Sequence, residues 1–444
     1  MSPNFDNEGQ ILRFELERLL PYEKLFELAK ITGFCKRIRK LHPIIFMQLI
    51  IFSPCFHSHS TVAEIWRNHA NLTESTIAYS SYVDRLNDTS LRFFKAVLDE
   101  CIKSPATGMS LKLRERYEKF VTVYIQDSTI VRLNKKLADR FPATRSRKIA
   151  AGIKISYLLN VLANGAAKIS IVPERTAEIK TLRVGPWVKG TLLLIDLGFY
   201  KYQLFARINE NQGYFISRVK RSSILIVKKF NSPVTDSQNE LFLGRDLLSF
   251  LQELGDTSID TTVLVQLKRR SYQGKQRQEQ YPFRCVGRVH PDTGEWHLYL
   301  TNLIGEEFTV DEIAELYRFR WEIESLFDET KNECTLGDIR VTRDGAVMTL
   351  LYAALIRQMV LKRVYLVMRR LMSEHDRNKL SLDLYGRAFI EQMDLLLMVI
   401  LDEWKECEKQ FFGVKGLQMW FFRLSHHSQQ YHVSKLTRDT FVHR

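Results

Sequence analysis

The sequence predicts an α/β protein in which a central, sheet-forming region is flanked by helical regions at both ends. At the two ends, apolar residues recur with the spacing of helices. In the centre, short runs of β-branched and aromatic residues alternate with turn residues, which is typical of strands. One of these runs, Leu192–Ile195, is wholly apolar. Such a strand is expected in the middle of a sheet that helices cover on each side.

Residues 1–115 are expected to be helical. The expected helices include 11–20, 22–32 and 44–51. A helix at 61–68, a turn at Asn71–Leu72 and a second helix from Thr73 to Leu86 would form a helix-turn-helix, whose second helix would present a polar face to DNA. Any helical hairpin gives the same pattern, so a DNA-reading role and a purely structural role both remain open.

From residue 120 onward the pattern changes to that of strands. Strands are expected at 121–125, 153–162, 166–172 and 192–195, and a short helix at 176–183. Asn164-Gly165 stands between the second and third of these strands and is a strong signal for a hairpin turn.

Asp127 and Asp196 are expected at the ends of two central strands. A carboxylate at a buried strand end costs free energy unless it has a partner. Either acid alone is explained by capping of a following turn or helix, which is a common role of Asp. Two such acids, together with a third at Glu324, favour a shared cation instead.

The third acid lies in residues 311–333, a segment without Gly or Pro that carries acids early and a lysine late, as helices favour. At 100° per residue, one narrow stripe of this helix holds Tyr317, Arg320, Glu324 and Lys331. A carboxylate between cations and a phenol suits a metal ligand beside groups that bind phosphate. A surface helix with i,i+3 and i,i+4 pairs explains the same spacing.

Residues 206–300 are expected to form an inserted β-rich module. Its expected elements are strands at 213–219, 224–230, 261–267, 283–289 and 296–300, and a helix at 246–254. The loop 268–277 is dense in cations, and is either an arm that contacts the DNA backbone or a solvated hairpin tip. Further on, 346–364 and 392–404 are strongly apolar, for packing or for self-association.

The chain of 444 residues carries 65 Lys and Arg against 51 Asp and Glu, a formal net charge of +14. This excess favours a polyanionic partner, most commonly nucleic acid, although a charged solubilising surface gives the same balance. The six cysteines form no CxxC pair, which favours a reducing, intracellular compartment. No signal peptide or membrane span is expected, because the N-terminus is polar and the longest apolar run, 43–56, is shorter than about 20 residues.

These motifs resemble those of the insertion-sequence-four family of DDE transposases. Tyr317-x2-Arg320-x3-Glu324-x6-Lys331 is similar to the YREK signature of that family. The first-acid and second-acid motifs of the family resemble Asp127-Ser128-Thr129 and Asp196-Leu197-Gly198-Phe199-Tyr200, and the strand that follows is similar to 214–220. The resemblance covers roughly residues 120–335.

The resemblance implies a ribonuclease-H-like catalytic core that a β-rich insertion interrupts before the third acid. The catalytic, metal-binding residues would be Asp127, Asp196 and Glu324. They would hold two Mg²⁺ ions, with Mn²⁺ tolerated, since oxygen ligands favour hard cations. The 128 residues from the second acid to the third are too many for a simple crossover, which agrees with an insertion.

The resemblance also implies DNA contacts. Tyr317, Arg320 and Lys331 would contact phosphates near the transposon end, and Arg218 is a lesser candidate for the same role. Family members that cut through a DNA hairpin stack a flipped base on a Trp of the insertion. Trp296 has a suitable position for that role, but it is explained equally well as an ordinary strand aromatic.

The expected domain organisation has five parts. These are a helical DNA-binding domain at 1–115, the first part of the core at 116–205, the insertion at 206–300, the helix with the third acid at 301–345, and a helical region at 346–444 for dimerisation.

The expected function is cut-and-paste transposition of an insertion sequence. The protein is expected in the cytoplasm of a prokaryote, associated with the nucleoid. The expected partners are double-stranded DNA, as terminal inverted repeats and target, and a second copy of the chain in a synaptic homodimer, with no membrane partner. Two alternatives remain: a ribonuclease-H-like nuclease without strand transfer, and a catalytically silent DNA-binding relative.

Overall fold

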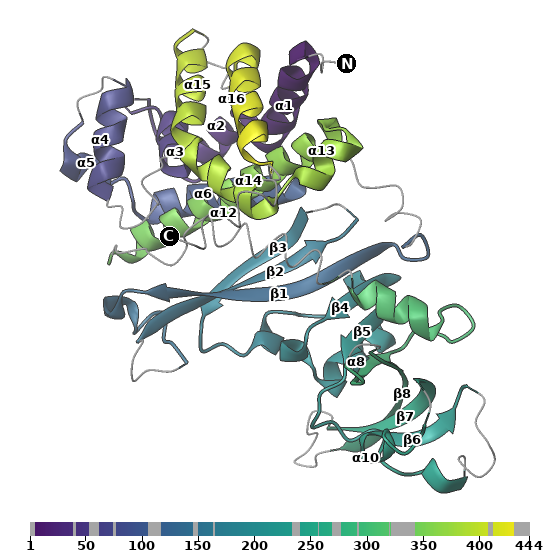
Figure 1. The fold of residues 1–444 in the computed structure, drawn as a ribbon. Helices are drawn as coiled ribbons and strands as arrows, with labels where there is room; N and C mark the ends of the chain where they lie inside the picture. Colours follow the sequence, from purple (N-terminus) through teal and green to yellow (C-terminus); the bar gives the residue numbers. More distant parts are fainter. Residues whose placement is uncertain are drawn as a thin grey trace, which may run out of the picture. The chain divides into compact units, whose positions relative to one another are not determined.

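The computed structural model describes residues 5–38, 41–52, 62–73, 77–104, 117–144, 150–162, 165–232, 240–255, 257–268, 277–290, 293–318, 320, 342–406 and 412–429 (Figure 1). By their contacts they divide into two compact units. The helical unit takes its residues from 1–108, 131–153 and 326–444, and the sheet unit from 109–130 and 154–325. Both ends of the chain therefore belong to one unit, which differs from the separate terminal domains expected from the sequence.

The described residues of the helical unit form helices near both ends of the chain, in the regions 1–115 and 346–444 that were expected to be helical. They are α1 (Phe5–Leu19), α2 (Tyr22–Ile31), α3 (Pro43–Phe52), α4 (Val62–Thr73), α5 (Tyr79–Val83), α6 (Asp88–Lys103), α12 (Asp344–Leu371), α13 (Glu374–Lys379), α14 (Leu382–Glu391), α15 (Met393–Glu406) and α16 (Val414–His427). All ten residues of α3 are buried. Such a helix needs neighbours on every side, and α2, α4, α12 and α15 supply them.

Helix α12 is the centre of the helical unit and contacts α1, α3 and α6. It is the one described helix that is long and apolar enough to cross a membrane, yet 83% of its most apolar window of 18 residues is buried inside the protein. Burial by neighbouring helices is what the core helix of a globular unit requires. The packing alternative for 346–364 therefore accounts for its hydrophobicity.

The expected helix-turn-helix is wrong. Helix α4 continues through Asn71 and Leu72 to Thr73, where the turn was expected. The helix that follows, α5, has only five residues, too few for the expected recognition helix. The physical reason is that neither Asn nor Leu breaks a helix as Pro or Gly does.

In the described part of the chain, nine strands form one sheet. They are β1 (Thr122–Leu133), β2 (Ala151–Asn160), β3 (Gly165–Pro173), β4 (Thr191–Ile195), β5 (Tyr214–Arg218), β6 (Ile226–Phe230), β7 (Ser258–Lys268), β8 (Gln278–Val289) and β9 (Trp296–Thr301). Their spatial order is β3-β2-β1-β4-β5-β9-β8-β7-β6. Strand β4 runs parallel to both β1 and β5, whereas the pairs β5–β9, β9–β8, β8–β7 and β7–β6 are antiparallel. The α/β class with a ribonuclease-H-like first half, β3-β2-β1-β4-β5, is confirmed.

Helix α8 (Tyr202–Glu210) connects β4 to β5, as parallel neighbours require a crossover. Its Phe205 stacks on Phe215 of β5, with ring centroids 4.4 Å apart, inside one hydrophobic cluster that also takes in β7 and β8. The insertion therefore shares a core with the strands that carry the acids.

The expected start of the insertion at residue 206 needs correction. Residue 206 lies inside α8, and β5 pairs with β4 as part of the first half of the sheet. The added strands begin after β5, and the last of them, β9, returns to pair with β5. A strand pattern in the sequence shows which residues alternate but not which strand pairs with it. The pattern at 213–219 therefore could not show that this strand pairs with β4 and β9.

A buried ion pair ties α1 to α12. Arg363 Nη1 lies 2.9 Å from Glu15 Oε2, and the two side chains are 5% and 1% exposed. Burial lowers the pKa of Arg363, and Glu15 opposes that shift. We expect Glu15→Ala to lower the free energy of unfolding by about 3–5 kcal/mol, because it leaves a buried guanidinium without its carboxylate. Denaturant titration measures this loss.

Two controls accompany that prediction. Lys95→Ala, which removes the exposed pair between Lys95 and Asp99, should cost less than about 1 kcal/mol. The double variant Glu15→Leu/Arg363→Met should recover most of the loss, since an apolar pair needs no compensation. A loss for Glu15→Ala no larger than for Lys95→Ala would contradict the importance of this ion pair.

Candidate active site

The register of β1 and β4 brings the first two acids together. The last pair of this parallel ladder joins Gln126 to Ile195. Asp127 follows Gln126, and Asp196 follows Ile195. Asp196 keeps an extended backbone, with φ −75° and ψ 161°. Residues in register on neighbouring parallel strands start about 4.8 Å apart and point to the same face. Two acids separated by 69 residues of sequence therefore lie side by side.

Asp127 is not at the end of its strand, as was expected, because β1 continues to Leu133. The residues after Asp127 include Thr129, Ile130 and Val131, which favour extended backbone. Only the pairing with β4 stops at Gln126. Asp127 thus lies where β1 loses its β4 neighbour, and its side chain is half-buried.

Asp196 has two roles in the structure. Its Oδ2 accepts a hydrogen bond from the Gly198 backbone N–H at 3.3 Å, which caps the short 3₁₀ helix η5 (Leu197–Phe199). Its Oδ1 faces Arg320 Nη2 at 3.7 Å. The side chain is still 44% exposed. The capping interpretation is therefore correct for Asp196, and the carboxylate remains accessible to a ligand.

A helix that begins at Val310 is anchored beside these acids. Tyr317 is 1% exposed, and its hydroxyl donates to the carbonyl of Ile195 at 3.3 Å. The Arg320 guanidinium lies over the Tyr317 ring, 5.2 Å from its centroid, and is 3% exposed. Tyr317 thus fixes the helix to the end of β4. A contact of Tyr317 or Arg320 with phosphate stays a prediction.

Glu324 and Lys331 lie outside the described residues, as does most of the cationic loop expected at 268–277. The described part of the expected helix, 310–318 and 320, is helical.

Arg218, on a third strand, forms a row with the two acids. In the parallel ladder of β4 and β5, Ile195 pairs with Ser217. Arg218 is therefore the residue in register with Asp196, just as Asp127 is on the other side. A cation beside two carboxylates at one sheet edge is well placed for a phosphate that approaches the acids. A contact of Arg218 with phosphate stays a prediction.

Trp296 begins β9 and lies further from the acids. Tyr299 pairs with Arg218, so Trp296 stands three residues, about 10 Å, beyond that point. Its side chain is partly buried against the hydrophobic cluster of the sheet unit. This packing agrees with the ordinary strand aromatic, and base stacking by Trp296 stays a prediction.

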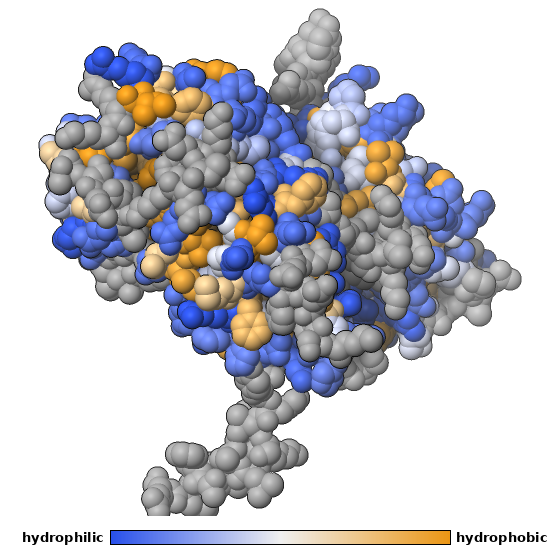
Figure 2. All heavy atoms as spheres, turned by 90° about the horizontal axis from the view of Figure 1, so that it is seen from above, coloured by the Kyte–Doolittle hydropathy of each residue, from blue (hydrophilic) through white to orange (hydrophobic). Residues whose placement is uncertain are grey.

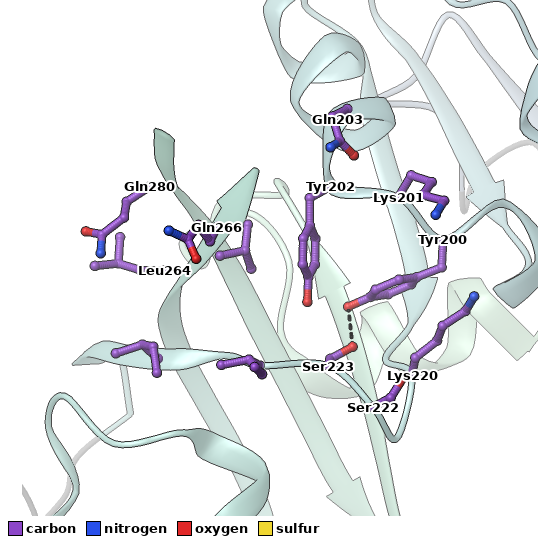
Figure 3. A pocket seen from close by; sticks show the side chains of 13 residues that line it. Tyr200, Lys201, Tyr202, Gln203, Lys220, Ser222, Ser223, Leu264, Gln266 and Gln280 are labelled. Carbon is purple, nitrogen blue, oxygen red and sulfur yellow. Dashed lines mark hydrogen bonds between the residues drawn. The ribbon is translucent and has the colours of Figure 1, made fainter. Parts of the chain in front are cut away.

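A cavity of about 720 Å³ opens next to the second acid motif (Figure 3). The sequence did not predict it. It is lined by residues that include Tyr200, Lys201, Tyr202, Lys220 and Ser223. The two tyrosine side chains extend toward one another above Ser223, whose hydroxyl donates to Tyr200 Oη at 3.1 Å (Figure 3). Burial raises the pKa of Tyr200, which keeps its phenol neutral. The available signal was the Tyr-Lys-Tyr run at 200–202, which begins at the last residue of the second acid motif.

The donor set fits a hard divalent cation. Asp127 and Asp196 offer carboxylate oxygens from adjacent strands, which is the ligand type that Mg²⁺ and Mn²⁺ prefer. Within the described ranges no group of three His, Cys, Asp or Glu residues forms a metal site. The expected third ligand, Glu324, is outside those ranges.

Comparison with known proteins supports the same region. A family model described as the transposase DDE domain matches residues 119–358. The chain is 22% identical over 414 residues to the transposase for insertion sequence element IS231E of Bacillus thuringiensis subsp. finitimus, covering 86% of this chain and 85% of that protein. It is 21% identical over 384 residues to the transposase for IS1151 of Clostridium perfringens, covering 80% and 81%.

Among solved structures, a piggyBac transposase synaptic complex with hairpin DNA aligns with 95% of this chain and 85% of that chain, at 12% identity and a TM-score of 0.47. The family model spans more than half of the 444 residues and contains Asp127, Asp196, Arg218 and the helix from Val310. The chain therefore belongs to the transposase DDE domain family, as its motifs predicted.

Proposed function

We propose that this DNA transposase cuts the terminal inverted repeats of an insertion sequence and joins the freed 3′-hydroxyl ends to target DNA. The observation that supports this most directly is the row formed by Asp127, Asp196 and Arg218, directly after the point where the parallel pairing of β1, β4 and β5 ends. Ligands of open α/β sheets bind at this edge of the sheet. The row combines two ligands for a cation with one partner for a phosphate.

The DDE family uses divalent metal ions, and we assign them here to Asp127, Asp196 and Glu324. We propose two Mg²⁺ ions, with Mn²⁺ tolerated, because the donors are oxygen atoms. Bound divalent ions supply activation of the attacking water or 3′-hydroxyl and stabilisation of the leaving oxygen.

The residues around the acids prepare the site for an anionic substrate. Arg320, buried beside Asp196, offsets part of the carboxylate charge. Tyr317 holds the helix that carries Arg320 against the end of β4. Arg218, half-buried at the end of the row, is our candidate for contact with the phosphate next to the cut.

The partners follow from the same chemistry. A net charge of +14 supports binding of DNA as a polyanion. Joining both ends of one element requires two active sites, so we propose a homodimer in the synaptic complex, and cytoplasmic action at the nucleoid. Figure 2 shows hydrophobic side chains in small groups among hydrophilic ones on the face seen there. We propose that DNA bound to both copies also helps to hold the homodimer together.

Asp127→Asn should lower the rate of end cleavage in Mg²⁺ on the order of 10³-fold or more, because several kcal/mol of transition-state stabilisation depend on a charged ligand. Binding of the same end DNA in Ca²⁺ should persist. The matched control is Asp99→Asn, an exposed aspartate of α6. Wild-type cleavage by Asp127→Asn would remove the proposed mechanism, and pre-cut ends that are never joined would reduce the protein to a nuclease.

Arg218→Gln should weaken DNA binding and make the slope of log K against log salt less negative by about 0.9, the share of one phosphate contact. Titrations at several salt concentrations measure that slope. Arg377→Gln, which removes an exposed arginine of the helical unit, serves as the control. If Arg218→Gln left the slope unchanged, Arg218 would not contact phosphate. The same titration on Arg320→Gln tests whether Arg320 binds DNA.

A further inference from the structure

The segment between β3 and β4 contains a glutamate that no motif of the sequence singled out. Glu178 begins the 3₁₀ helix η3 (Glu178–Lys180). Its Oε1 accepts a hydrogen bond from Ser128 Oγ at 3.1 Å. Ser128 directly follows Asp127 on β1. Glu178 is thus joined to the residue next to the first acid.

The same carboxylate touches the turn after the second acid. A methyl group placed on Gly198 would lie 1.9 Å from Glu178 Oε2 and 3.0 Å from its Cδ. Gly198 is the residue whose N–H binds Asp196 Oδ2. The Glu178 carboxylate therefore packs directly against the backbone that caps Asp196, and only glycine leaves room for it.

Lys154 helps to fix the position of Glu178. Lys154 Nζ lies 3.8 Å from Glu178 Oε1, its side chain is 9% exposed, and it donates to the carbonyl of Thr176 at 2.9 Å. The buried Lys154 ammonium therefore pairs with the Glu178 carboxylate and also binds the backbone carbonyl of Thr176, two residues earlier. The Lys154 ammonium also offsets a third negative charge next to the two acids.

A second set of hydrogen bonds reaches the other neighbour of Asp127. Gln126 Nε2 donates to Ser156 Oγ, and Ser156 Oγ donates to Thr181 Oγ1 at 3.0 Å. Thr181 Oγ1 in turn donates to the carbonyl of Glu178 at 2.7 Å. Asp127 is therefore flanked on both sides by residues that are tied to the segment carrying Glu178.

We propose that Glu178 is a positioning residue of the active site, which fixes the backbones that carry Asp127 and Asp196 relative to one another so that both carboxylates bind the same divalent cations. The inference rests on the proposed function, since it presumes that the two acids bind metal. Glu178 acts through Ser128, which donates to its Oε1, and through Gly198, against which its Oε2 packs. Groups that orient metal ligands in this way typically change metal affinity or activity 10–100-fold when removed.

The first test measures Mn²⁺ binding to the full chain without DNA, together with end cleavage. Glu178→Ala should weaken Mn²⁺ binding and slow cleavage, each about 10–100-fold. Glu178→Gln keeps an acceptor for Ser128 and should retain clearly more of both than the alanine variant. Glu295→Ala, an exposed glutamate paired with Arg221, is the matched control. The midpoint of thermal unfolding, recorded for each variant, separates positioning from loss of the fold.

The second test uses the contact with Gly198. Gly198→Ala should impair Mn²⁺ binding, because its methyl group collides with the Glu178 carboxylate. Adding Glu178→Ala removes the colliding atoms, so the double variant should bind Mn²⁺ no more weakly than Glu178→Ala alone. The control is Gly185→Ala, whose methyl group would meet nothing closer than Trp187 Cδ1 at 3.8 Å.

The outcomes are distinguishable. Wild-type Mn²⁺ affinity in Glu178→Ala, or fully additive losses in the double variant, would overturn the positioning role. If Asp127→Asn abolished cleavage in the same experiments, the proposed function would stand without it. Wild-type cleavage by Asp127→Asn would instead remove the proposed function itself.

Discussion

The parallel pairing of β1, β4 and β5 is the constraint on which the rest of the site depends. It takes residues that are far apart in the sequence and sets Asp127, Asp196 and Arg218 in one row. Parallel strands need crossovers and cover on both faces, which explains why β4 is buried throughout and why the connection from β4 to β5 contains α8, which packs on β5. A one-residue slip in either ladder would turn an acid to the opposite face of the sheet.

The balance of charge at this edge also depends on the fold. Two carboxylates held side by side repel one another in the absence of a cation. Arg320, buried beside Asp196, lessens that repulsion, and the buried Lys154 offsets the charge of Glu178. Each is held by more than charge, since Arg320 lies on the Tyr317 ring and Lys154 donates to a backbone carbonyl. The fold therefore tolerates an acidic site before any ligand arrives.

Much of this arrangement could be predicted from the sequence, because strand patterns and acid motifs are local. The strands from β1 to β9 and the position of Asp196 after the end of β4 follow from such patterns, and so does the family, whereas Asp127 lies inside β1 and not at its end. Partners in space are a different matter. Nothing local showed that β5 pairs with β4, that Tyr317 is buried against Ile195, or that Glu178 contacts both segments that carry the acids. The helix-turn-helix expectation failed because a weak turn signal at Asn71 does not stop a helix whose neighbouring residues favour it.

The site works as proposed only if Asp127 and Asp196 bind the same cation. Crystals soaked in Mn²⁺ should then show an anomalous peak from manganese between the two carboxylates, with an oxygen of each about 2.0–2.3 Å from the ion, in the range of small divalent cations. Manganese that contacts only one of the two acids, or none, would contradict it.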